Sequence, residues 1–422
     1  MHIGIFEDES FRNFLPLTFL RPVFDLRCGA LTLREKILAH LPTDSLTLFL
    51  RPSLLDLAGE ENPSASFAFD PALTSEMLIV NGRCIMNRTV ARKIMKTKGE
   101  AIFVSGETFV AARLAGANLE SAVSAIRSGL SAGMFDEVIP RVELDVPLVS
   151  YPWDLLYSLE TEITNDIAFL AAKTKSSKKG KGIHRNAVLI GRKNIFVGKK
   201  SEVGPGVVLD ASDGPIYIGQ GVKILPNAFV AGPATIGDGT LVKAGARIYG
   251  HTSIGPVCKV AGEIEHSIFQ SHANKAHDGY VGHSFIASWV NLGAGTTTSN
   301  LKNTYGSIKA VIDGKSIDSG RMFLGLTAGD HVKTGINATL DTGTVIGVSS
   351  NMFGTSLPPK SIPSFTWGSD GELGTYDCER AVGVAEKVMA RRSVVCTEAY
   401  KSLLREVYKT TEHERTGNTT AS

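Results

Sequence analysis

The sequence predicts an α/β domain followed by an all-β solenoid and a helical tail, and three observations lead to this fold class. Apolar runs alternate with helical stretches over the first third of the chain. A six-residue apolar repeat begins at Val197, and a helical apolar stripe runs through the last part of the chain. At 422 residues the chain is long enough for two or more domains with separate cores.

Strands and helices alternate in the first region, which we assign to residues 1–172. The apolar runs "MHIGIF", "SLTLFL" and "EMLIVNG" alternate with helical stretches such as "LTLREKILAHL" and "ESAVSAIRSGL". This alternation predicts a mostly parallel sheet with crossover helices. We expect a further helix from Pro152, and the basic segment "KTKSSKKGKG" after it predicts a linker over residues 173–185.

A six-residue repeat dominates the second region, which we assign to residues 186–358. Eight apolar residues stand six apart without exception: Ile218, Ile224, Val230, Ile236, Val242, Ile248, Ile254 and Val260. A period of six fits neither a helix nor a simple strand, but it fits a parallel β-helix in which three hexapeptides make one coil of a triangular prism.

The repeat breaks once and then returns. It is interrupted over residues 263–335 and resumes with Leu340, Ile346 and Met352, so the break lies inside the solenoid. The tail, residues 359–422, carries a helical apolar stripe through Ala381 and Ala385. We expect this tail to cap the open end of the solenoid.

Composition limits the partners. The 44 Lys and Arg against 42 Asp and Glu give a net charge of +2, which supplies no broad field for nucleic acid or an anionic membrane. We therefore expect small-molecule partners. The opening "MHIGIFEDES" lacks the pattern of a secretory signal, and no apolar run approaches the length of a membrane span, so we expect a cytoplasmic protein.

The broken part of the repeat resembles a known family. The strings "KAHDGYVGHSFIASWVNLGAGTTTSNLKNTYGSIKA" and "DGKSIDSGRMFLGLTAGDHVKTGINATL" resemble the acetyltransferase half of bifunctional enzymes that make UDP-N-acetylglucosamine from glucosamine-1-phosphate. The chain is most similar to a variant group in which a shortened, Rossmann-like nucleotidyltransferase domain precedes the β-helix. The resemblance implies a left-handed β-helix, acetyl-CoA as cosubstrate, and a homotrimer with active sites at the seams.

The resemblance also implies roles for five residues. Moving an acetyl group from a thioester to an amine needs a base for the amine proton and donors for the oxyanion. His277 matches the family's base, and histidine ordinarily titrates near neutral pH. Tyr280 and Asn291 would hold the sugar, and Asn300 would orient its amine. The backbone amide of Ala294 would face the oxyanion.

Further residues of the same strings would contact phosphates or the thioester. They are Gly293, Gly295, Lys302, Lys309, Arg321 and Thr334. The two glycines would let the thioester approach the backbone closely. The sequence departs from the better-known members at Glu265, where they carry a lysine for the sugar phosphate, and at Ile336, where they carry a serine.

Other interpretations of these residues stay open. Asn291 is also suited to an asparagine ladder along a solenoid, and Lys302 and Lys309 to ordinary solvated positions. Four histidines, His266, His272, His277 and His283, lie close in sequence, and hexapeptide carbonic anhydrases bind zinc through histidines.

The first domain lacks the G-x-G-T-R loop with which ordinary nucleotidyltransferases hold triphosphate. Its opening, "IFEDESFRNFLPLTFLRPVFDLRCGALTLREKI", offers arginines instead. Guanidinium groups bind phosphate oxygens bidentately, so Arg12, Arg21 and Arg27 are the phosphate candidates. The alternative is that the arginines form structural ion pairs with Glu7, Asp8 and Asp25.

The strand end "LIVNGRC" supplies a second group of candidates. Asn81, Gly82 and Arg83 would lie at the carboxyl edge of the sheet, where open α/β folds bind ligands. Common members of the family carry a magnesium-binding aspartate where this chain has Arg83. Mg²⁺ would therefore need another carboxylate, for which we name Asp166.

The predicted function is sugar-nucleotide synthesis in two steps. The first acetylates the amine of a hexosamine-1-phosphate from acetyl-CoA. The second transfers a nucleotidyl group from UTP or dTTP to the sugar phosphate, with Mg²⁺, and releases pyrophosphate. Two alternatives are an acyltransferase whose first domain only binds a sugar nucleotide, and a noncatalytic scaffold.

Overall fold

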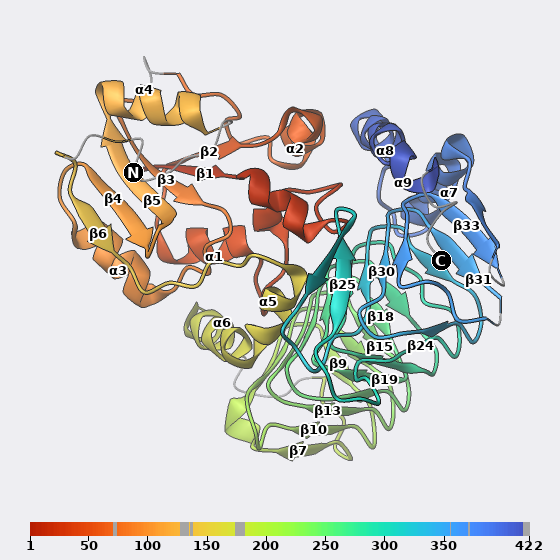
Figure 1. Cartoon of the computed structure of the whole chain (residues 1–422). Helices are drawn as coiled ribbons and strands as arrows, with labels where there is room; N and C mark the ends of the chain where they lie inside the picture. Colours follow the sequence, from red (N-terminus) through yellow and green to blue (C-terminus); the bar gives the residue numbers. More distant parts are fainter. Residues whose placement is uncertain are drawn as a thin grey trace. The chain divides into compact units, whose positions relative to one another are not determined.

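The computed structural model describes residues 1–70, 74–126, 135, 138–173, 182–354, 356–369 and 372–416 (Figure 1). Its contacts divide the chain into two compact units. Unit 1 is Met1–Phe14, Leu20–Leu26 and Leu31–Tyr151, and unit 2 is Leu15–Phe19, Arg27–Ala30 and Pro152–Ser422. Residues 152–172, which the sequence groups with the first domain, thus lie in unit 2, as do two short segments near the N-terminus. Most of the predicted linker, residues 174–181, is outside the described residues.

Unit 1 is built on a six-stranded sheet. Its strands in the order of the sheet are β2 (Ser45–Phe49), β1 (His2–Phe6), β3 (Glu76–Asn81), β5 (Thr108–Ala115), β4 (Ala101–Ser105) and β6 (Arg141–Glu143). β1 runs parallel to β2 and β3, but β5 is antiparallel to both of its neighbours. The sequence analysis missed this hairpin, in which Gly106 takes a positive φ in a two-residue turn between β4 and β5.

Short helices connect the strands of unit 1. They are α1 (Leu33–His40), α2 (Leu55–Glu61), α3 (Arg88–Lys96) and α4 (Gly116–Ala125), with 3₁₀ helices at Glu9–Phe14, Val23–Asp25 and Pro52–Leu54. α1 confirms the helix predicted from "LTLREKILAHL", and a capping box between Thr32 and Glu35 fixes its start. Asn87 caps α3 by accepting from two backbone amides.

Unit 2 contains the predicted parallel β-helix (Figure 1). Its first face is β7 (Val188–Ile190), β10 (Val208–Asp210), β13 (Phe229–Ala231), β16 (Arg247–Ile248), β19 (Glu263–Glu265) and β22 (Tyr280–Gly282). Its second face is β8 (Ile195–Val197), β11 (Ile216–Ile218), β14 (Ala234–Ile236), β17 (Thr252–Ile254), β20 (Ile268–Phe269), β23 (Phe285–Ile286), β27 (Thr327–Ala328), β30 (Val345–Ile346) and β32 (Ser361–Ile362).

The third face is interrupted. It begins with β9 (Glu202–Val203), β12 (Lys223–Ile224), β15 (Leu241–Val242), β18 (Lys259–Val260) and β21 (Asn274–Lys275), and it resumes with β28 (Lys333–Thr334), β31 (Asn351–Phe353), β33 (Thr366–Ser369) and β34 (Glu372–Thr375). All eight residues of the six-residue repeat are buried in one core cluster, which confirms that the repeat fills the interior. Leu340, Ile346 and Met352 continue the same cluster beyond the break.

The break in the repeat is an enlarged coil. β24 (Thr297–Thr298) pairs with β29 (Thr339–Leu340), and a protruding hairpin lies between them, made by β25 (Lys309–Ile312) and β26 (Lys315–Asp318). The hairpin turns at Asp313 and Gly314, which both have positive φ. This is the Asp-Gly pair that a tight primed turn requires.

Helices flank the β-helix within unit 2. They are α5 (Pro152–Tyr157), α6 (Leu159–Lys173), α7 (Cys378–Ala390), α8 (Glu398–Thr410) and α9 (Glu412–Thr416). Among the described residues, no helix has the length and apolarity that a bilayer crossing requires.

The prediction that the tail caps the end of the solenoid is wrong. Arg392 donates to the carbonyl of Val257, and Tyr400 on α8 bonds the His331 ring at 2.8 Å. Tyr408 packs edge-on against Phe365. Because these partners belong to well-separated coils, the helical tail lies along the side of the β-helix.

Candidate functional sites

The break in unit 2 gathers a partly buried polar cluster. The Tyr280 hydroxyl donates to Glu265 Oε2 at 2.9 Å and accepts from Asn300 Nδ2 at 2.9 Å. The Asn300 amide nitrogen also lies 3.0 Å from His283 Nδ1. Two predicted residues, Tyr280 and Asn300, are therefore brought together with Glu265.

Strand pairing builds this cluster. β19 and β22 are neighbours, with Glu263 opposite Tyr280 and Glu265 opposite Gly282. A Cβ at Gly282 would lie 2.2 Å from the Tyr280 hydroxyl, so only glycine leaves room for the ring above it.

The surroundings of this cluster favour the neutral forms of the His283 imidazole and the Tyr280 hydroxyl. Burial lowers the pKa of His283 to about 3, with His266 and His251 adding to the shift, so this imidazole is neutral at physiological pH. The His283 ring stacks on His266 with centroids 4.5 Å apart. Burial and the Glu265 carboxylate raise the pKa of Tyr280, which keeps its hydroxyl as a proton donor.

His277 lies in the exposed turn between β21 and β22. Its backbone carbonyl accepts a hydrogen bond from Lys275 Nζ, and the next carbonyl, that of Asp278, does the same. Among the described residues, none hydrogen-bonds the His277 imidazole, so the ring faces outward.

The "GAG" turn occupies the corresponding corner of the next coil. The Gly295 amide donates to the Asp278 carbonyl at 2.9 Å, which joins this turn to the turn that carries His277. Within the described part of the chain, no acceptor takes the Ala294 N–H, while the Ala294 carbonyl binds the Asn337 amide. The Ala294 amide is thus available to a ligand.

The glycines beside Ala294 have a structural reason of their own. A Cβ at Gly293 would lie 2.3 Å from the Gly335 carbonyl, and one at Gly295 would lie 2.0 Å from Asn337 Oδ1. Both therefore allow the next coil to stack closely. Thr334 is buried, and its hydroxyl bonds Thr296 at 2.7 Å and the Gly293 amide at 3.0 Å.

Asn291 is exposed and belongs to a ladder. Bridges join it to Asn274 on one side and to Lys333 on the other, and the Asn274 amide reaches its oxygen at 3.4 Å. Because Asn291 is exposed, this is not a ladder inside the coil.

Of the cationic candidates that the structure describes, only Arg321 is shown next to this cluster, through Tyr157, whose ring centroid lies 6.2 Å from that of His283. Lys302 binds the Ser307 carbonyl, and Lys309 is exposed on β25. The Arg321 guanidinium lies 4.2 Å from the ring centre of Tyr157, which donates to the Phe323 carbonyl.

The zinc alternative finds little support in the histidines. His266 and His283 meet through their ring faces, and His272 stacks on Trp289 at 4.2 Å. Stacked rings do not direct their nitrogens to a common point. Over the residues that the structure describes, no group of three or more histidine, cysteine or acidic side chains is placed to bind a metal.

Unit 1 has a cavity of about 470 Å³ beside the carboxyl ends of β1 and β2. Phenylalanine rings line much of it, from Phe11, Phe49, Phe67 and Phe69. Carboxyl ends of parallel strands are where open α/β sheets bind ligands.

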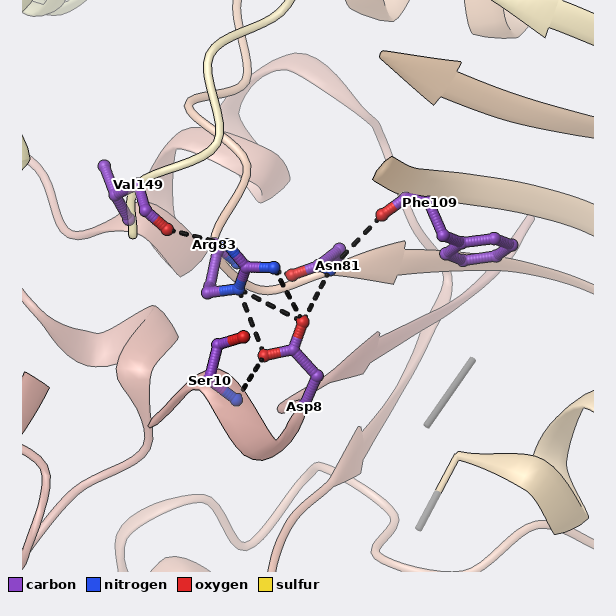
Figure 2. A network of polar contacts seen from close by, with 6 residues as sticks. All are labelled: Asp8, Ser10, Asn81, Arg83, Phe109 and Val149. Atoms are coloured by element: carbon purple, nitrogen blue, oxygen red, sulfur yellow. Dashed lines mark hydrogen bonds and ion pairs between the residues drawn. The ribbon is translucent and has the colours of Figure 1, made fainter. Parts of the chain in front are cut away.

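Asp8 lines this cavity. Its side chain also bonds residues at the end of β3 (Figure 2). Its carboxylate accepts two bonds from Arg83 Nε at 3.1 Å and one from Nη2 at 2.9 Å. Asn81 donates to the same carboxylate at 3.1 Å, and the Ser10 amide adds a further bond. The remaining Arg83 nitrogen binds the Val149 carbonyl at 2.8 Å.

The side chains of Asn81 and Arg83 at the end of β3 are therefore engaged in hydrogen bonds within unit 1. Arg83 and Asn81 are buried, and a Cβ at Gly82 would lie 2.6 Å from the Phe24 ring. The alternative of a structural ion pair holds for Arg83 with Asp8.

Arg51, which the sequence analysis missed, lines the cavity together with Glu7, which it named only as an ion-pair partner. Arg51 pairs with Glu7 at 2.5 Å, and its guanidinium lies 4.3 Å from the centre of the Phe11 ring. Burial raises the pKa of Glu7, although the Arg51 charge opposes the shift. Arg51 directly follows the strand run "SLTLFL". Its place at the carboxyl end of a predicted strand could have marked it as a ligand-binding candidate.

The three predicted phosphate arginines do not form one group. Arg12 lies 5.4 Å from the Phe11 ring, close to the cavity, and forms an exposed ion pair with Glu9. Arg27 belongs to unit 2, where it is buried and binds the backbone and side chain of Gln270. The carbonyl of Arg21 accepts from Arg51. Asp166 lies on α6 in unit 2, buried against Gly29.

Family models match both parts of the chain. Residues 3–175 match the model for sugar nucleotidyl transferases. Residues 215–250 match the model for bacterial transferase hexapeptide repeats. The chain thus contains one segment similar to sugar nucleotidyl transferases and a later segment similar to transferase hexapeptide repeats.

Curated relatives named as bifunctional proteins match parts of the chain. A bifunctional sugar-1-phosphate nucleotidylyltransferase/acetyltransferase of Sulfurisphaera tokodaii is 41% identical over 91 residues, which are 22% of this chain and 23% of that protein. A bifunctional protein GlmU of Methanococcus vannielii is 36% identical over 110 residues, 26% of each chain. Another, from a Nostoc species, is 25% identical over 175 residues, 41% of this chain and 34% of that protein.

These matches cover about a third or less of the relatives' length. Among solved structures, an Arabidopsis UDP-N-acetylglucosamine acyltransferase aligns over 56% of this chain and 91% of its own, at 14% identity. Its TM-score of 0.28 is too low to support a conclusion about function.

Proposed function

We propose that unit 2 transfers an acetyl group from acetyl-CoA to the amine of a hexosamine-1-phosphate, with glucosamine-1-phosphate as the first substrate to test. The observation that carries this proposal is the cluster of Glu265, Tyr280, His283 and Asn300 at the break in the β-helix. A smooth β-helix offers no pocket, and here its regular wall gives way to a dense polar group. The name of the Sulfurisphaera tokodaii relative, which includes an acetyltransferase, supports the same activity.

The acetyl transfer requires few groups. The amine nitrogen attacks the thioester carbon, the carbonyl oxygen becomes an oxyanion, and the carbon–sulfur bond then breaks. His277 takes the proton that the amine loses and returns it to the leaving thiolate. The Ala294 amide donates to the oxyanion, and Asn300 with Tyr280 orients the amino sugar.

Unit 1 transfers a nucleotidyl group from UTP or dTTP to the sugar-1-phosphate in this proposal, and pyrophosphate leaves. The pyrimidine ring of the nucleotide occupies the phenylalanine-lined cavity, and Arg51 with Arg12 binds the triphosphate. Their two positive charges offset the negative charge that develops on the phosphoryl oxygens.

The carboxylates of the cavity do not fit a magnesium ion held by the protein. Glu7 pairs with Arg51, Asp8 with Arg83, and Glu9 with Arg12. Each carboxylate is thus already matched with a guanidinium group, so we derive no step through a metal held by these side chains.

One observation favours a second function for unit 1. Arg83 and Asp8 are locked together where ordinary members of the family place a magnesium-binding aspartate. A unit that binds a sugar nucleotide without reacting with it fits this arrangement as well.

Two assays separate these proposals. The first mixes acetyl-CoA with glucosamine-1-phosphate and measures the free thiol released. The variant His277→Ala should lower this rate by roughly 10²–10⁴-fold, and the exposed His184 provides a control through His184→Ala. No thiol release by the unaltered chain would refute the acetyl transfer.

The second assay mixes UTP, Mg²⁺ and N-acetylglucosamine-1-phosphate and measures pyrophosphate. Pyrophosphate release supports the bifunctional enzyme. If no hexose-1-phosphate yields pyrophosphate with UTP or dTTP, while UDP-N-acetylglucosamine still binds, unit 1 is a binding domain.

The proposal includes assembly as a homotrimer, in which His277 and Asn291 face a neighbouring subunit. Both side chains are exposed in the single chain, as seam residues would be. Sedimentation velocity tests this directly, and a purely monomeric profile would contradict a shared site.

A further inference from the structure

Lys275 occupies an interior position of the β-helix. It lies opposite Val260 in the pairing of β18 with β21, and Val242 and Ile224 precede it in the same row. Those residues are buried and apolar, and Lys275 itself is 0% exposed. A charged ammonium in such a place is costly unless hydrogen bonds compensate it.

The ammonium of Lys275 has two backbone acceptors. Its Nζ donates to the carbonyls of His277 and Asp278, which form the exposed turn just beyond β21. The Asp278 carbonyl also accepts from the Gly295 amide at 2.9 Å. One buried charge therefore joins the turn that carries His277 to the turn that carries Ala294.

The coil next to this turn explains why it needs support from inside. The corner between β18 and β19 contains only Ala261 and Gly262, whereas residues 276–279 separate β21 from β22. A Cβ at Gly262 would lie 3.1 Å from the His277 carbonyl. The shorter corner offers no side chain larger than the Ala261 methyl group, and the Glu263 amide bonds the far end of the turn at the Gly279 carbonyl, 3.0 Å away. The Lys275 ammonium adds the contact from the interior at His277 and Asp278.

We infer that Lys275 is a positioning residue for acetyl transfer, which fixes the backbone of the His277 turn relative to the Ala294 amide from within the β-helix. This inference rests on the proposed acetyltransferase function. Lys275 touches neither substrate nor thioester in this arrangement. Its burial lowers its pKa to about 8, which is consistent with a charge held in an apolar interior at some cost.

The apolar variant Lys275→Met tests the inference because it fills the same interior space. The gain from removing a buried charge offsets the loss of two hydrogen bonds, so we expect the melting temperature to change by only a few degrees. We expect kcat for acetyl transfer to fall about 10²-fold, as a small displacement of a catalytic group does, with KM changed much less. The control is Lys36→Met, which removes a lysine buried in α1 of unit 1 and should leave acetyl transfer unchanged.

A double-mutant cycle with His277→Ala decides whether Lys275 acts through His277. If it does, adding Lys275→Met to His277→Ala lowers kcat no further, because the base is already absent. Fully multiplicative losses would overturn the inference, and so would an unchanged kcat in the single variant.

Hydrogen exchange gives a readout that does not need activity. Lys275→Met should speed amide exchange over residues 276–279 and 293–296 and leave the rest of the β-helix unchanged. If the unaltered chain shows no acetyl transfer, the proposed function fails, and hydrogen exchange still tests whether Lys275 holds the turn. Unchanged exchange in both segments would overturn the inference.

Discussion

The ion pair of Asp8 and Arg83 gives the sharpest prediction for unit 1. Four atoms of these side chains meet in three hydrogen bonds of 2.9–3.1 Å, and the side chains are only 17% and 9% exposed. Asp8→Asn removes the negative charge and leaves the Arg83 guanidinium buried among neutral groups.

The expected cost follows from that burial. Breaking a buried pair by removing one partner costs about 3–5 kcal/mol, mainly because the other charge is left uncompensated. With a urea dependence of about 2 kcal/mol per molar for a unit of this size, the unfolding midpoint of unit 1 should fall by about 2 M. Asp8→Leu with Arg83→Met removes both charges and should be less destabilising than Asp8→Asn alone.

The distribution of tryptophans separates the two units in this measurement. All three tryptophans, Trp153, Trp289 and Trp367, belong to unit 2, so their fluorescence reports unit 2 alone. Far-ultraviolet circular dichroism follows helices of both units. Asp8→Asn should therefore move a circular dichroism transition to lower urea and leave the fluorescence transition in place. A midpoint unchanged within 0.3 M, a margin well below the roughly 2 M shift expected, would refute the role of the pair.

Three further predictions concern the two sites. Arg51→Lys keeps a positive charge beside Glu7 but loses the planar fork, so the KM for UTP should rise about tenfold in the pyrophosphate assay, and an unchanged KM would exclude Arg51 from triphosphate binding. Tyr280→Phe leaves the partly buried Glu265 without its hydroxyl donor and should lower kcat/KM for the amino sugar by about 10–100-fold. Tyr305→Phe, at an exposed tyrosine between β24 and β25, should have no effect. The pKa of Lys275 is about 8 in the folded protein and 10.5 when exposed, so between these pH values the unfolded chain binds more protons and the unaltered chain gains stability as the pH rises. In urea titrations, the stability of Lys275→Met relative to the unaltered chain should therefore decline from pH 8 to pH 10.5. A constant difference would contradict the buried charge.

Periodicity predicted the β-helix well because its signal is repeated. Each residue of the six-residue row fills the same interior position, so one misfit does not obscure the pattern. The tail gave a weaker signal. Its apolar stripe predicts a packed helix but says nothing about which surface it packs on, and the partners Val257, His331 and Phe365 are far apart in sequence.

The candidate site was predictable only where the chain resembles known relatives. Tyr280 and Asn300 are side by side because β22 and β24 lie on neighbouring coils, and the matched string contained both. The role of Lys275 left no trace in the repeat, because it stands where the six-residue spacing has already lapsed. In unit 1, Arg51 pairs with Glu7 across 44 positions, a contact that depends on the pairing of β1 with β2.

Two places in this chain each gather several exceptions to the ordinary rules of folding. A lysine replaces a valine inside the β-helix, a corner loses two residues, and a glutamate, a tyrosine and a neutral histidine bond one another, all within the coils next to the break. In unit 1, buried Glu7 and the Asp8–Arg83 pair gather at the strand ends beside the cavity. Single buried charged residues also lie elsewhere, among them Lys36 in α1 and Arg27 and Asp166 in unit 2. Proteins tolerate local violations mainly where a function needs them, so their concentration at one place in each unit argues for two separate sites.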